Sequence, residues 1–157
     1  MNPLPAYPHA SVTGLQLFQL YRDGLLDPTG VATLLDIKCP EVEDGRIVFT
    51  CKTRSEFANP LGLLHGGIAA TLLDSAMACA VHTTLPANLA YASLDISVRY
   101  IRPGAVDGGE LRAEGRVMHR GRKMCTAEAT LHDEAGQLIA TATSSLMVLP
   151  LAQTAAP

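Results

Sequence analysis

The sequence predicts an α+β fold in which an antiparallel β-sheet wraps around one long central helix, with an extra helix near the N-terminus. The segment from His65 to about Thr83 has no helix breaker after Gly67, and apolar residues occupy almost every side of it. Such a segment is typical of a helix that is buried over most of its circumference. The hydrophobic period then changes to two along the rest of the chain. A sheet that buries the helix against its apolar face satisfies both patterns.

The N-terminal segment predicts a tail, a helix and a loop, in that order. Residues 1–11 are Pro-rich and are expected to form a loosely held tail. From residue 11 to residue 23, apolar side chains recur at i, i+3 and i+4, which is typical of an amphipathic helix, and Gly24 ends it. Pro28 and Gly30 mark the loop that follows.

Alternating segments on both sides of the central helix predict the sheet. Two strands, 33–42 and 46–52, precede the helix, and the Asp-Gly turn between them indicates a hairpin. The strands after the helix are joined by short turns, which predicts an antiparallel meander. They span 92–102, 109–118, 124–133 and 138–148. In the first of these, the apolar residues from Leu94 to Tyr100 are expected to share one face.

Composition limits the classes of function. The 157 residues, 48% hydrophobic and 17% charged, suit one globular domain. A net charge of −3 and the absence of Trp predict no nucleic-acid partner, and no apolar run reaches the roughly 20 residues that span a membrane. We expect a tail and helix over 1–32, the main domain over 33–150 and a C-terminal tail over 151–157.

The cysteines, the N-terminus and the histidines indicate a cytoplasmic protein without a metal. Cys39, Cys51, Cys79 and Cys125 show no CxxC pairing and lie in apolar segments, which is typical of reduced core thiols. The first twelve residues lack the charged and apolar regions of a secretory signal. No histidine has a metal-ligand spacing such as HExxH.

The central helix opens on His65-Gly66-Gly67. The first N–H groups of a helix have no partner within it and lie at the positive end of its dipole. Glycine lets a ligand oxygen approach this backbone without a Cβ in the way. The arrangement suits an anion or a carbonyl oxygen that gains negative charge during a reaction, which is an oxyanion hole. The alternative is that the two glycines form only a tight entry turn.

Asp74 interrupts the apolar pattern of this helix. It lies between "ATLL" and "SAMACAV", and no cationic residue is near it in the sequence. A carboxylate in such surroundings loses hydration unless it is paired, and carboxylates of this kind often mark active sites. Two alternatives remain: Asp74 lies on a solvated stripe of the helix, or it bonds to a strand backbone.

Gly66 and Asp74 can act on one reacting group only if two chains meet. The eight residues from one to the other correspond to about 12 Å of helix. An oxyanion donor and a base must both lie about 3 Å from the same carbonyl group. Two antiparallel copies of the helix across a two-fold axis would bring Gly66 of one chain near Asp74 of the other. If both residues are catalytic, we predict a homodimer with two shared sites.

Over roughly residues 33–149 the chain resembles the hotdog-fold acyl-CoA thioesterases of the phenylacetic-acid-degradation type. Three segments carry the resemblance: 59–81 with its His-Gly-Gly and later acid, 93–104, and 115–148. The second segment holds an Asp-x-x-x-x-Tyr-x-Arg-Pro pattern. The residues of that pattern are Asp95, Tyr100, Arg102 and Pro103.

The resemblance implies roles for single residues. The Gly66 N–H would donate to the thioester oxygen, and Asp74 of the opposite subunit would act as general base or nucleophile. Asn59 would orient the carbonyl or the water, His65 would support the site from the helix start, and Ser93 would position water beside the carboxylate. The resemblance also implies hydrolysis of an aromatic or short- to medium-chain acyl-CoA, no cofactor besides the CoA of the substrate, and homodimers that pair into a homotetramer.

The basic turn "HRGRK" at 119–123 is expected to bind the phosphates of CoA. The alternative is a solvated hairpin tip. Together with the second glycine of the helix start, the predicted substrate-binding residues are Gly67, Arg120, Gly121, Arg122 and Lys123.

Three alternatives stay open at this stage. A hotdog hydratase would need an acid shortly before His65, whereas Asp74 follows it. A non-catalytic acyl-CoA or acyl-carrier binding protein would not need that carboxylate. We expect the N-terminal helix to pack on the outer face of the sheet; the alternative is that it lines or covers the acyl pocket. The apolar residues that would do so are Leu17, Phe18, Leu20 and Tyr21.

Overall fold

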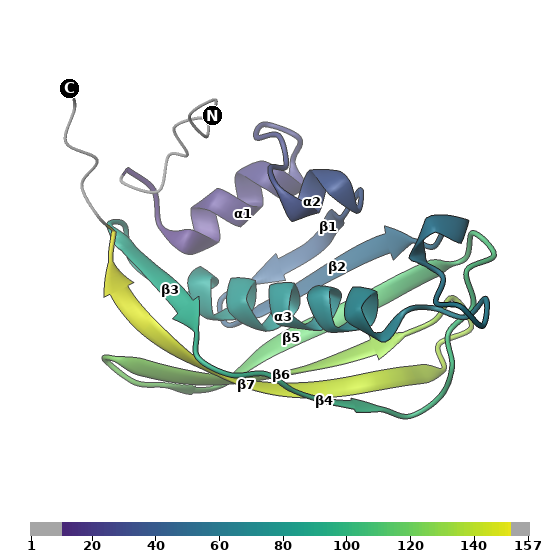
Figure 1. Ribbon diagram of the computed structural model, residues 1–157. Coiled ribbons are helices and arrows are strands. Elements are labelled where there is room, and N and C mark those ends of the chain that lie inside the picture. Colours follow the sequence, from purple (N-terminus) through teal and green to yellow (C-terminus); the bar gives the residue numbers. More distant parts are fainter. Residues whose placement is uncertain (1–10, 152–157) are drawn as a thin grey trace, which may run out of the picture.

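The computed structural model describes residues 11–151, in which a curled antiparallel sheet surrounds one helix (Figure 1). The helices are α1 (Gly14–Arg22), α2 (Val31–Leu34) and α3 (Gly66–Thr83), with a 3-10 turn, η2, at Ser55–Phe57. The strands are β1 (Lys38–Glu43), β2 (Arg46–Lys52), β3 (Leu89–Ser93), β4 (Ser97–Tyr100), β5 (Glu110–Arg120), β6 (Met124–His132) and β7 (Leu138–Pro150). This is the predicted α+β hotdog fold. The tails predicted over 1–11 and 151–157 lie almost entirely outside the described residues.

The strands form a single sheet with two free edges. Their order is β1-β2-β5-β6-β7-β3, β4 also pairs with β7, and every pair is antiparallel. The turns at Gly45 and Gly136 need a φ of +75°, which glycine adopts without strain. The meander of β5, β6 and β7 confirms the prediction from the short hairpins. No helix within residues 11–151 has the length and apolarity needed to cross a membrane.

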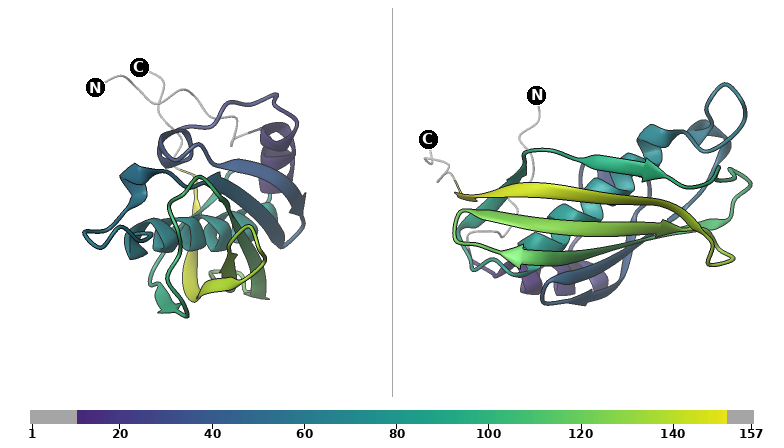
Figure 2. Two further views of the ribbon diagram at one scale, coloured as in Figure 1. Left: turned by 90° about the vertical axis from the view of Figure 1, so that its right-hand side faces the viewer. Right: turned by 90° about the horizontal axis from the view of Figure 1, so that it is seen from below.

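Helix α3 lies in the hollow of the sheet (Figure 2). Leu72, Leu73 and Met77 on its inner side are completely buried. Gly115 of β5 removes the side chain that would otherwise separate helix from sheet, because a Cβ there would lie 2.2 Å from the carbonyl oxygen of Ala76. The backbones of α3 and β5 therefore meet directly at this point.

Helix α1 begins and ends on defined caps. The Thr13 side chain accepts the Gln16 N–H, and the Gln16 side chain accepts the Thr13 N–H, which forms a capping box. At the other end, Gly24 has a φ of +71° and the Leu25 N–H donates to the Leu20 carbonyl, as in a Schellman motif. The sequence prediction of this helix and of its stop is confirmed.

The predicted position of α1 was wrong: it packs on the concave side of the sheet beside α3 (Figure 1). The Phe18 ring lies 6.3 Å from the Phe49 ring of β2 and 5.6 Å from the His82 ring of α3. The Gly14 N–H donates to the Leu85 carbonyl at 3.0 Å. An amphipathic pattern specifies which side of a helix is apolar, but it does not specify which face of a sheet that side meets.

The strand predicted over 33–42 begins later than expected. The short helix α2 takes its first residues, and Asp36 follows with a φ of +52°, so that β1 begins only at Lys38. The hydrogen bond from the Ile37 N–H to the Ala32 carbonyl, at 2.8 Å, closes this helical end. Apolar runs this short fit a helix end and a strand equally well, which explains the error.

The strand predicted over 92–102 is two strands, β3 and β4, and both pair with β7. Asp95 lies in the break between them. Its carbonyl accepts the Ser144 hydroxyl at 2.7 Å, and its carboxylate accepts the Ser145 N–H at 3.1 Å. The apolar residues from Leu94 to Tyr100 are largely exposed in this chain, so the predicted common face is not a buried one.

An ion-pair network covers the outer face of β2 and β5. Arg46 contacts Glu41 at 2.7 Å and Glu114 at 3.1 Å, and Arg112 contacts Glu41 at 3.0 Å. The hydrogen bonds from Arg46 hold the pKa of both carboxyl groups below the usual range. Strand alternation places Val48 on the same face, where it is completely buried. Strand β2 is therefore shielded on both of its faces.

Candidate active site

Asp74 lies on the side of α3 that the sheet leaves uncovered. The residues of this side are small or polar and none is fully buried: Gly67, Ala70, Thr71, Asp74 and Ser75. The Ser93 hydroxyl of β3 donates to the Asp74 carboxylate at 3.0 Å. The apolar sequence around Asp74 suggested deep burial, but within this chain the carboxylate is half-buried on the stripe that was the alternative. The structure thus places Asp74 and Ser93 together.

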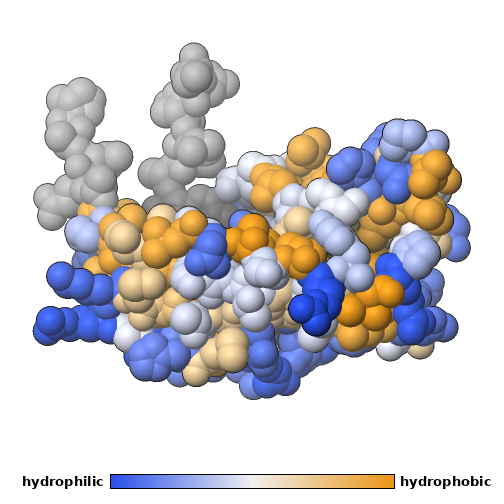
Figure 3. Space-filling model, turned by 60° about the horizontal axis from the view of Figure 1, so that its bottom comes forward, coloured by the Kyte–Doolittle hydropathy of each residue, from blue (hydrophilic) through white to orange (hydrophobic). Residues whose placement is uncertain are grey.

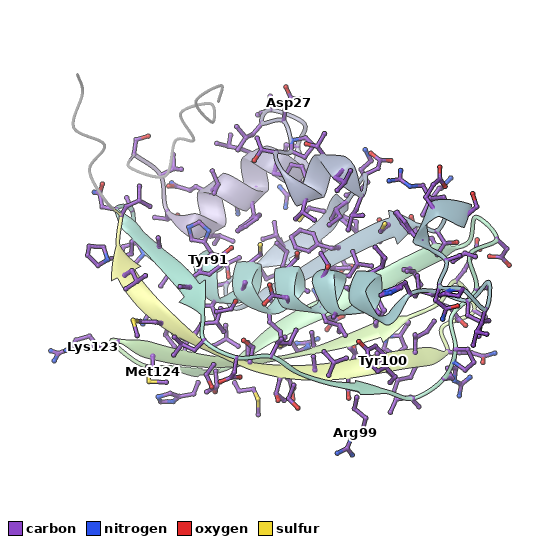
Figure 4. All side chains as sticks on the ribbon, viewed as in Figure 1. Asp27, Tyr91, Arg99, Tyr100, Lys123 and Met124 are labelled. Carbon is purple, nitrogen blue, oxygen red and sulfur yellow. The ribbon has the colours of Figure 1, made fainter. Side chains whose placement is uncertain are left out.

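Asp74 borders a partly open cavity of about 510 Å³, a volume typical of small-molecule sites. The cavity lies between the α1–α2 segment, β2, β3 and the uncovered side of α3, with Tyr91 beneath α1 (Figure 4). The lining residues are Leu17, Phe18, Tyr21, Leu26, Pro28, Thr29, Val31, Ala32, Ile37, Phe49, Asp74, Ser75, Ala78, Cys79, His82, Tyr91 and Ser93. Helix α1 therefore lines a pocket, which the sequence analysis gave as its alternative.

The N-terminus of α3 uses His65 as its cap. The Nδ1 atom of His65 accepts the Gly67 N–H at 2.9 Å, and its carbonyl accepts the Ile68 N–H at 3.0 Å. Among the described residues, no hydrogen bond uses the N–H of Gly66. Of the two glycines, Gly66 thus keeps a backbone donor for a ligand, whereas a ligand of the Gly67 N–H has to displace His65.

A tyrosine of β4 explains why position 66 is a glycine. The Tyr100 hydroxyl donates to the Gly66 carbonyl at 2.9 Å, and a Cβ on Gly66 would lie 3.0 Å from the tyrosine ring. A Cβ on Gly67 would lie 3.0 Å from Nδ1 of His65. Both glycines therefore have a packing role within the chain. From the sequence, Tyr100 was named as part of an alternating strand and of the family pattern, but no spacing signal links it to the helix start.

Asn59 holds the loop before α3 and lines the same groove as Gly66. Its Oδ1 atom accepts the Leu61 N–H at 2.9 Å and the Leu63 N–H at 3.2 Å, as in an Asx turn. Its carboxamide nitrogen has no hydrogen-bond partner in the described part of the chain, so it can donate to a ligand. Asn59, Gly66 and Tyr100 border a groove of about 370 Å³.

The candidate catalytic residues form two groups. Asn59, His65 and Gly66 gather at the start of α3, whereas Asp74 and Ser93 lie beside its middle. The groove at the helix start and the cavity at Asp74 have no lining residue in common. Because the two groups are separated by about 12 Å of helix, one chain does not bring the predicted oxyanion donor and the predicted base to one reacting atom.

A second groove connects Asp74 to an exposed edge of the sheet. It has a volume of about 400 Å³, and its lining residues are Ala70, Thr71, Asp74, Ser93, Leu94, Asp95 and Ile96. Strands β3 and β4 form the edge, where Leu94 is 50% exposed and Tyr100 is 54% exposed. The space-filling view turned toward the underside shows hydrophobic patches between polar ones (Figure 3). Large exposed apolar side chains beside a partly uncovered helix are typical of an interaction surface.

The basic turn at 119–123 lies at the far end of α3 from Gly66. Arg120 donates to the Thr84 hydroxyl, at the C-terminal cap of α3, at 3.0 Å. The other two cations of the turn are exposed, and no ion pair joins them to a described residue; Lys123 points into solvent (Figure 4). The 18 residues of α3 correspond to about 27 Å. A ligand of this turn and of Gly66 in one chain would have to span that length.

The four cysteines are free thiols, as predicted. Cys79 lines the cavity, and its sulfur lies 3.8 Å from the Tyr91 hydroxyl. Burial raises the pKa of Cys79 to about 12 and that of Cys39 to about 12. Thiols with so high a pKa stay protonated near neutral pH and are poor nucleophiles. Within residues 11–151, no cluster of three His, Cys, Asp or Glu side chains could hold a metal ion.

Known proteins resemble this chain in sequence and in structure. The family model of the thioesterase superfamily matches residues 61–140. The proofreading thioesterase EntH of Cronobacter turicensis is 28% identical, over 79% of this chain and 91% of that protein. Acyl-coenzyme A thioesterase 13 of Homo sapiens is 29% identical, over 61% of this chain and 68% of that protein. The crystal structure of a phenylacetic acid degradation-related protein from Ralstonia eutropha JMP134 is 29% identical with a TM-score of 0.75, over 83% of this chain and 98% of that chain.

Proposed function

This chain belongs to the thioesterase superfamily, and on that premise we propose that it hydrolyses acyl-CoA thioesters to a free acid and CoA. The observation that carries the proposal is the half-buried Asp74 carboxylate, which accepts the Ser93 hydroxyl at the border of a largely apolar cavity. An aromatic or a short- to medium-chain acyl group suits such a cavity. The names of EntH and of human acyl-coenzyme A thioesterase 13 support the reaction class.

In the proposed reaction, Asp74 either activates a water molecule or attacks the thioester carbon itself. As a general base it takes a proton from water while the water oxygen bonds to the thioester carbon. As a nucleophile its own oxygen bonds to that carbon, and water then cleaves the resulting anhydride. In both routes the C–S bond breaks and its electron pair leaves on sulfur. A thiolate is a good leaving group near neutral pH, so no Ser-His-Asp triad is needed.

The start of α3 stabilises the charge that develops on the thioester oxygen. The Gly66 N–H is the proposed oxyanion donor, since the dipole of α3 adds a positive end at the same place. The carboxamide nitrogen of Asn59 is the proposed second donor, toward the carbonyl or the water. His65 holds the helix start through the Gly67 N–H, and Ser93 fixes one oxygen of the carboxylate so that the other faces water.

A second copy of the chain completes the proposed site. An antiparallel α3 from the partner would bring its Gly66 against the groove of Asp74, along the stripe of small residues that the sheet leaves uncovered. The same docking would cover the exposed apolar side chains of β3 and β4. We propose that these homodimers pair into a homotetramer. Reaction in the cytoplasm, without a cofactor, is the remaining part of the proposal, and free thiols agree with a reducing compartment.

The basic turn is the proposed contact for CoA phosphates. Its cations project at the C-terminal end of α3, away from their own Gly66, so they serve a CoA that extends from a shared site. Arg122→Ala is therefore expected to raise KM for CoA esters several-fold while kcat changes little, and to leave KM unchanged for an N-acetylcysteamine thioester, which lacks the nucleotide. Equal effects on both substrates would contradict this role.

Thiol release from a panel of esters tests the proposed function. Benzoyl-, phenylacetyl-, hydroxybenzoyl-, hexanoyl- and lauroyl-CoA are each incubated with the wild type and with Asp74→Ala. We expect the wild type to release CoA from at least one ester and the variant to lose at least about 100-fold in kcat. Asp27→Ala, which changes an exposed carboxylate outside the site, is the matched control and keeps full activity.

The outcomes separate the candidate functions. A folded wild type that releases no CoA from any ester contradicts the proposal. Binding of an ester without turnover would then favour the acyl-CoA binding protein, and water addition to an enoyl-CoA would favour the hydratase. Full activity in Asp74→Ala would show that the protein is a thioesterase whose catalytic group is not Asp74.

A further inference from the structure

We infer that the cavity between the α1–α2 segment and α3 is the acyl pocket, and that it selects acyl groups whose far end carries no charge. This inference rests on the proposed function, because it names the substrate class of that site. It makes α1 a wall of the acyl pocket, which the predicted position on the outer face of the sheet would not have allowed.

Continuity between carboxylate and cavity is the first support. Asp74 and Ser93 line both the 510 Å³ cavity and the open groove of 400 Å³ at the sheet edge. A thioester carbon held at Asp74 therefore has two directions of exit. The open groove leads to the surface where the proposed partner chain docks, whereas the cavity leads into the chain. The acyl group goes inward, since its apolar surface gains by leaving water.

The charge inventory of the cavity is the second support. Among its lining residues from the described part of the chain, Asp74 is the single Asp, Glu, Lys or Arg. A carboxylate at the far end of an acyl group would lose its hydration in this space and find no guanidinium or ammonium partner there. It would also add negative charge to a pocket that already contains Asp74. Dicarboxylic acyl groups are therefore rejected.

Aromatic rings at the wall of the cavity are the third support. The Phe18 ring of α1 contacts the Phe49 and His82 rings, with centroids 6.3 and 5.6 Å away. The His82 ring in turn lies 5.3 Å from the Tyr91 ring. These contacts join α1, β2, α3 and β3 along the wall of the cavity. In the inferred pocket, the far end of the acyl group lies against Phe18, so that this ring sets the length of acyl group that fits.

A matched pair of esters tests whether the cavity rejects acyl groups with a charged far end. Hexanoyl-CoA and adipoyl-CoA have acyl chains of the same length and differ in the terminal carboxylate. We expect the wild type to favour hexanoyl-CoA by at least about 100-fold in kcat/KM. Calorimetric binding to Asp74→Asn is the second arm, and there hexanoyl-CoA should bind at least about 10-fold more tightly than adipoyl-CoA or free CoA. Equal values for the two esters would overturn the inference.

Substitution of Phe18 tests whether this ring limits the length of the acyl group. In Phe18→Ala, the ratio of kcat/KM for lauroyl-CoA to that for hexanoyl-CoA should rise about 10-fold, because the longer chain gains the vacated space. Phe18→Leu, which keeps an apolar side chain, should give a smaller rise and guards against a loss of folding in the first variant. Leu25→Ala is the control, since Leu25 is exposed and outside the lining, and its ratio should match the wild type.

The two proposals fail in different ways. A wild type without turnover of any ester contradicts the proposed function, and the binding arm still decides the acyl pocket. A wild type that hydrolyses hexanoyl- and adipoyl-CoA alike, with an unchanged ratio in both Phe18 variants, is a thioesterase whose acyl group lies elsewhere.

Discussion

The start of α3 and the middle of α3 hold polar groups by different means. At the start, the donors are backbone or amide N–H groups, and neighbours in the sequence fix them: His65 caps Gly67, and Asn59 binds its own loop. In the middle, one carboxylate stands beside a cavity built from α1, β2 and β3, and its partner Ser93 comes from a strand 19 residues later. Under the proposed function, each chain carries two half-sites, one made by local geometry and one by tertiary packing.

Mixing two inactive variants gives the strongest test of whether the two half-sites of one active site come from different chains. Asp74→Ala lacks one half-site and Asn59→Ala weakens the other, so each alone is expected to lose most activity. After unfolding and joint refolding, half of random dimers contain both variants, and each of these has one intact site of two. About a quarter of the wild-type activity should return.

Each variant unfolded and refolded alone is the control for this mixture and should stay inactive. Activity in the mixture no higher than the average of the two controls would place both half-sites in one chain and would contradict the shared site.

Tyr100→Phe sharpens the half-site at the helix start. The variant loses the hydrogen bond to the Gly66 carbonyl but keeps the ring packed on the glycine. We expect kcat to fall up to about 10-fold with KM nearly unchanged, since a lost hydrogen bond contributes about 1 kcal/mol and the oxyanion donor is then less well held. Steady-state kinetics with one CoA ester measure both constants. A change in KM alone would show that the tyrosine binds substrate and does not position Gly66.

Alkaline pH tests how strongly the cavity half-site is buried. Burial raises the pKa of Cys79 to about 12 from an ordinary 9, so the folded chain keeps a proton that the unfolded chain releases. Stability from this thiol is complete below pH 9 and is lost as the pH rises toward 12. Between pH 8 and pH 10, urea unfolding should show a loss of stability that is smaller in Cys79→Ala than in the wild type by an amount on the order of 1 kcal/mol, because the buried Cys39 contributes its own loss in both proteins. The same slope in both proteins would mean that the thiol is hydrated.

His65→Ala gives the smallest expected effect. The variant loses the cap on Gly67, which lowers the free energy of unfolding by about 0.5–1 kcal/mol. Because Asn is a good N-cap, His65→Asn should restore most of this stability. Urea unfolding at pH 7 compares the three proteins. Equal stability of the wild type and the alanine variant would show that the cap is not needed to form the helix start.

Local patterns predicted the frame of this protein well. The bounds of α3 follow from an apolar segment without helix breakers, and the β5–β7 meander follows from the period of two that burial of one face imposes on each strand. Asp74 was found for a related reason, because a charge stands out in an apolar helix. The outer-face position of α1 and the single strand over 92–102 were wrong. Both depend on contacts between distant residues, such as Phe18 with Phe49 and Asp95 with Ser144.

The same distinction explains what the sequence analysis missed in the site. The contact of Tyr100 with Gly66 joins residues 34 positions apart, and no periodicity encodes it. The cavity is lined by residues of five separate elements, α1, α2, β2, α3 and β3, so its lining has no signature in any one of them. Family resemblance named Ser93, whereas its bond to Asp74 became visible only in three dimensions.

The direct contact of Gly115 with Ala76 bears on how descendants of this chain can diverge. Any side chain at position 115 would push α3 off β5 and carry Asp74 away from Ser93. Few substitutions can therefore change the position of the carboxylate. In the α1–α2 segment, Gly14 meets the His82 carbonyl of α3 just as closely, but the residues that line the cavity, from Leu17 to Ala32, have ordinary side chains and are under no such constraint. Mutations that change the preferred acyl group are therefore expected to accumulate in the α1–α2 segment, while the contact between α3 and β5 that positions Asp74 is retained.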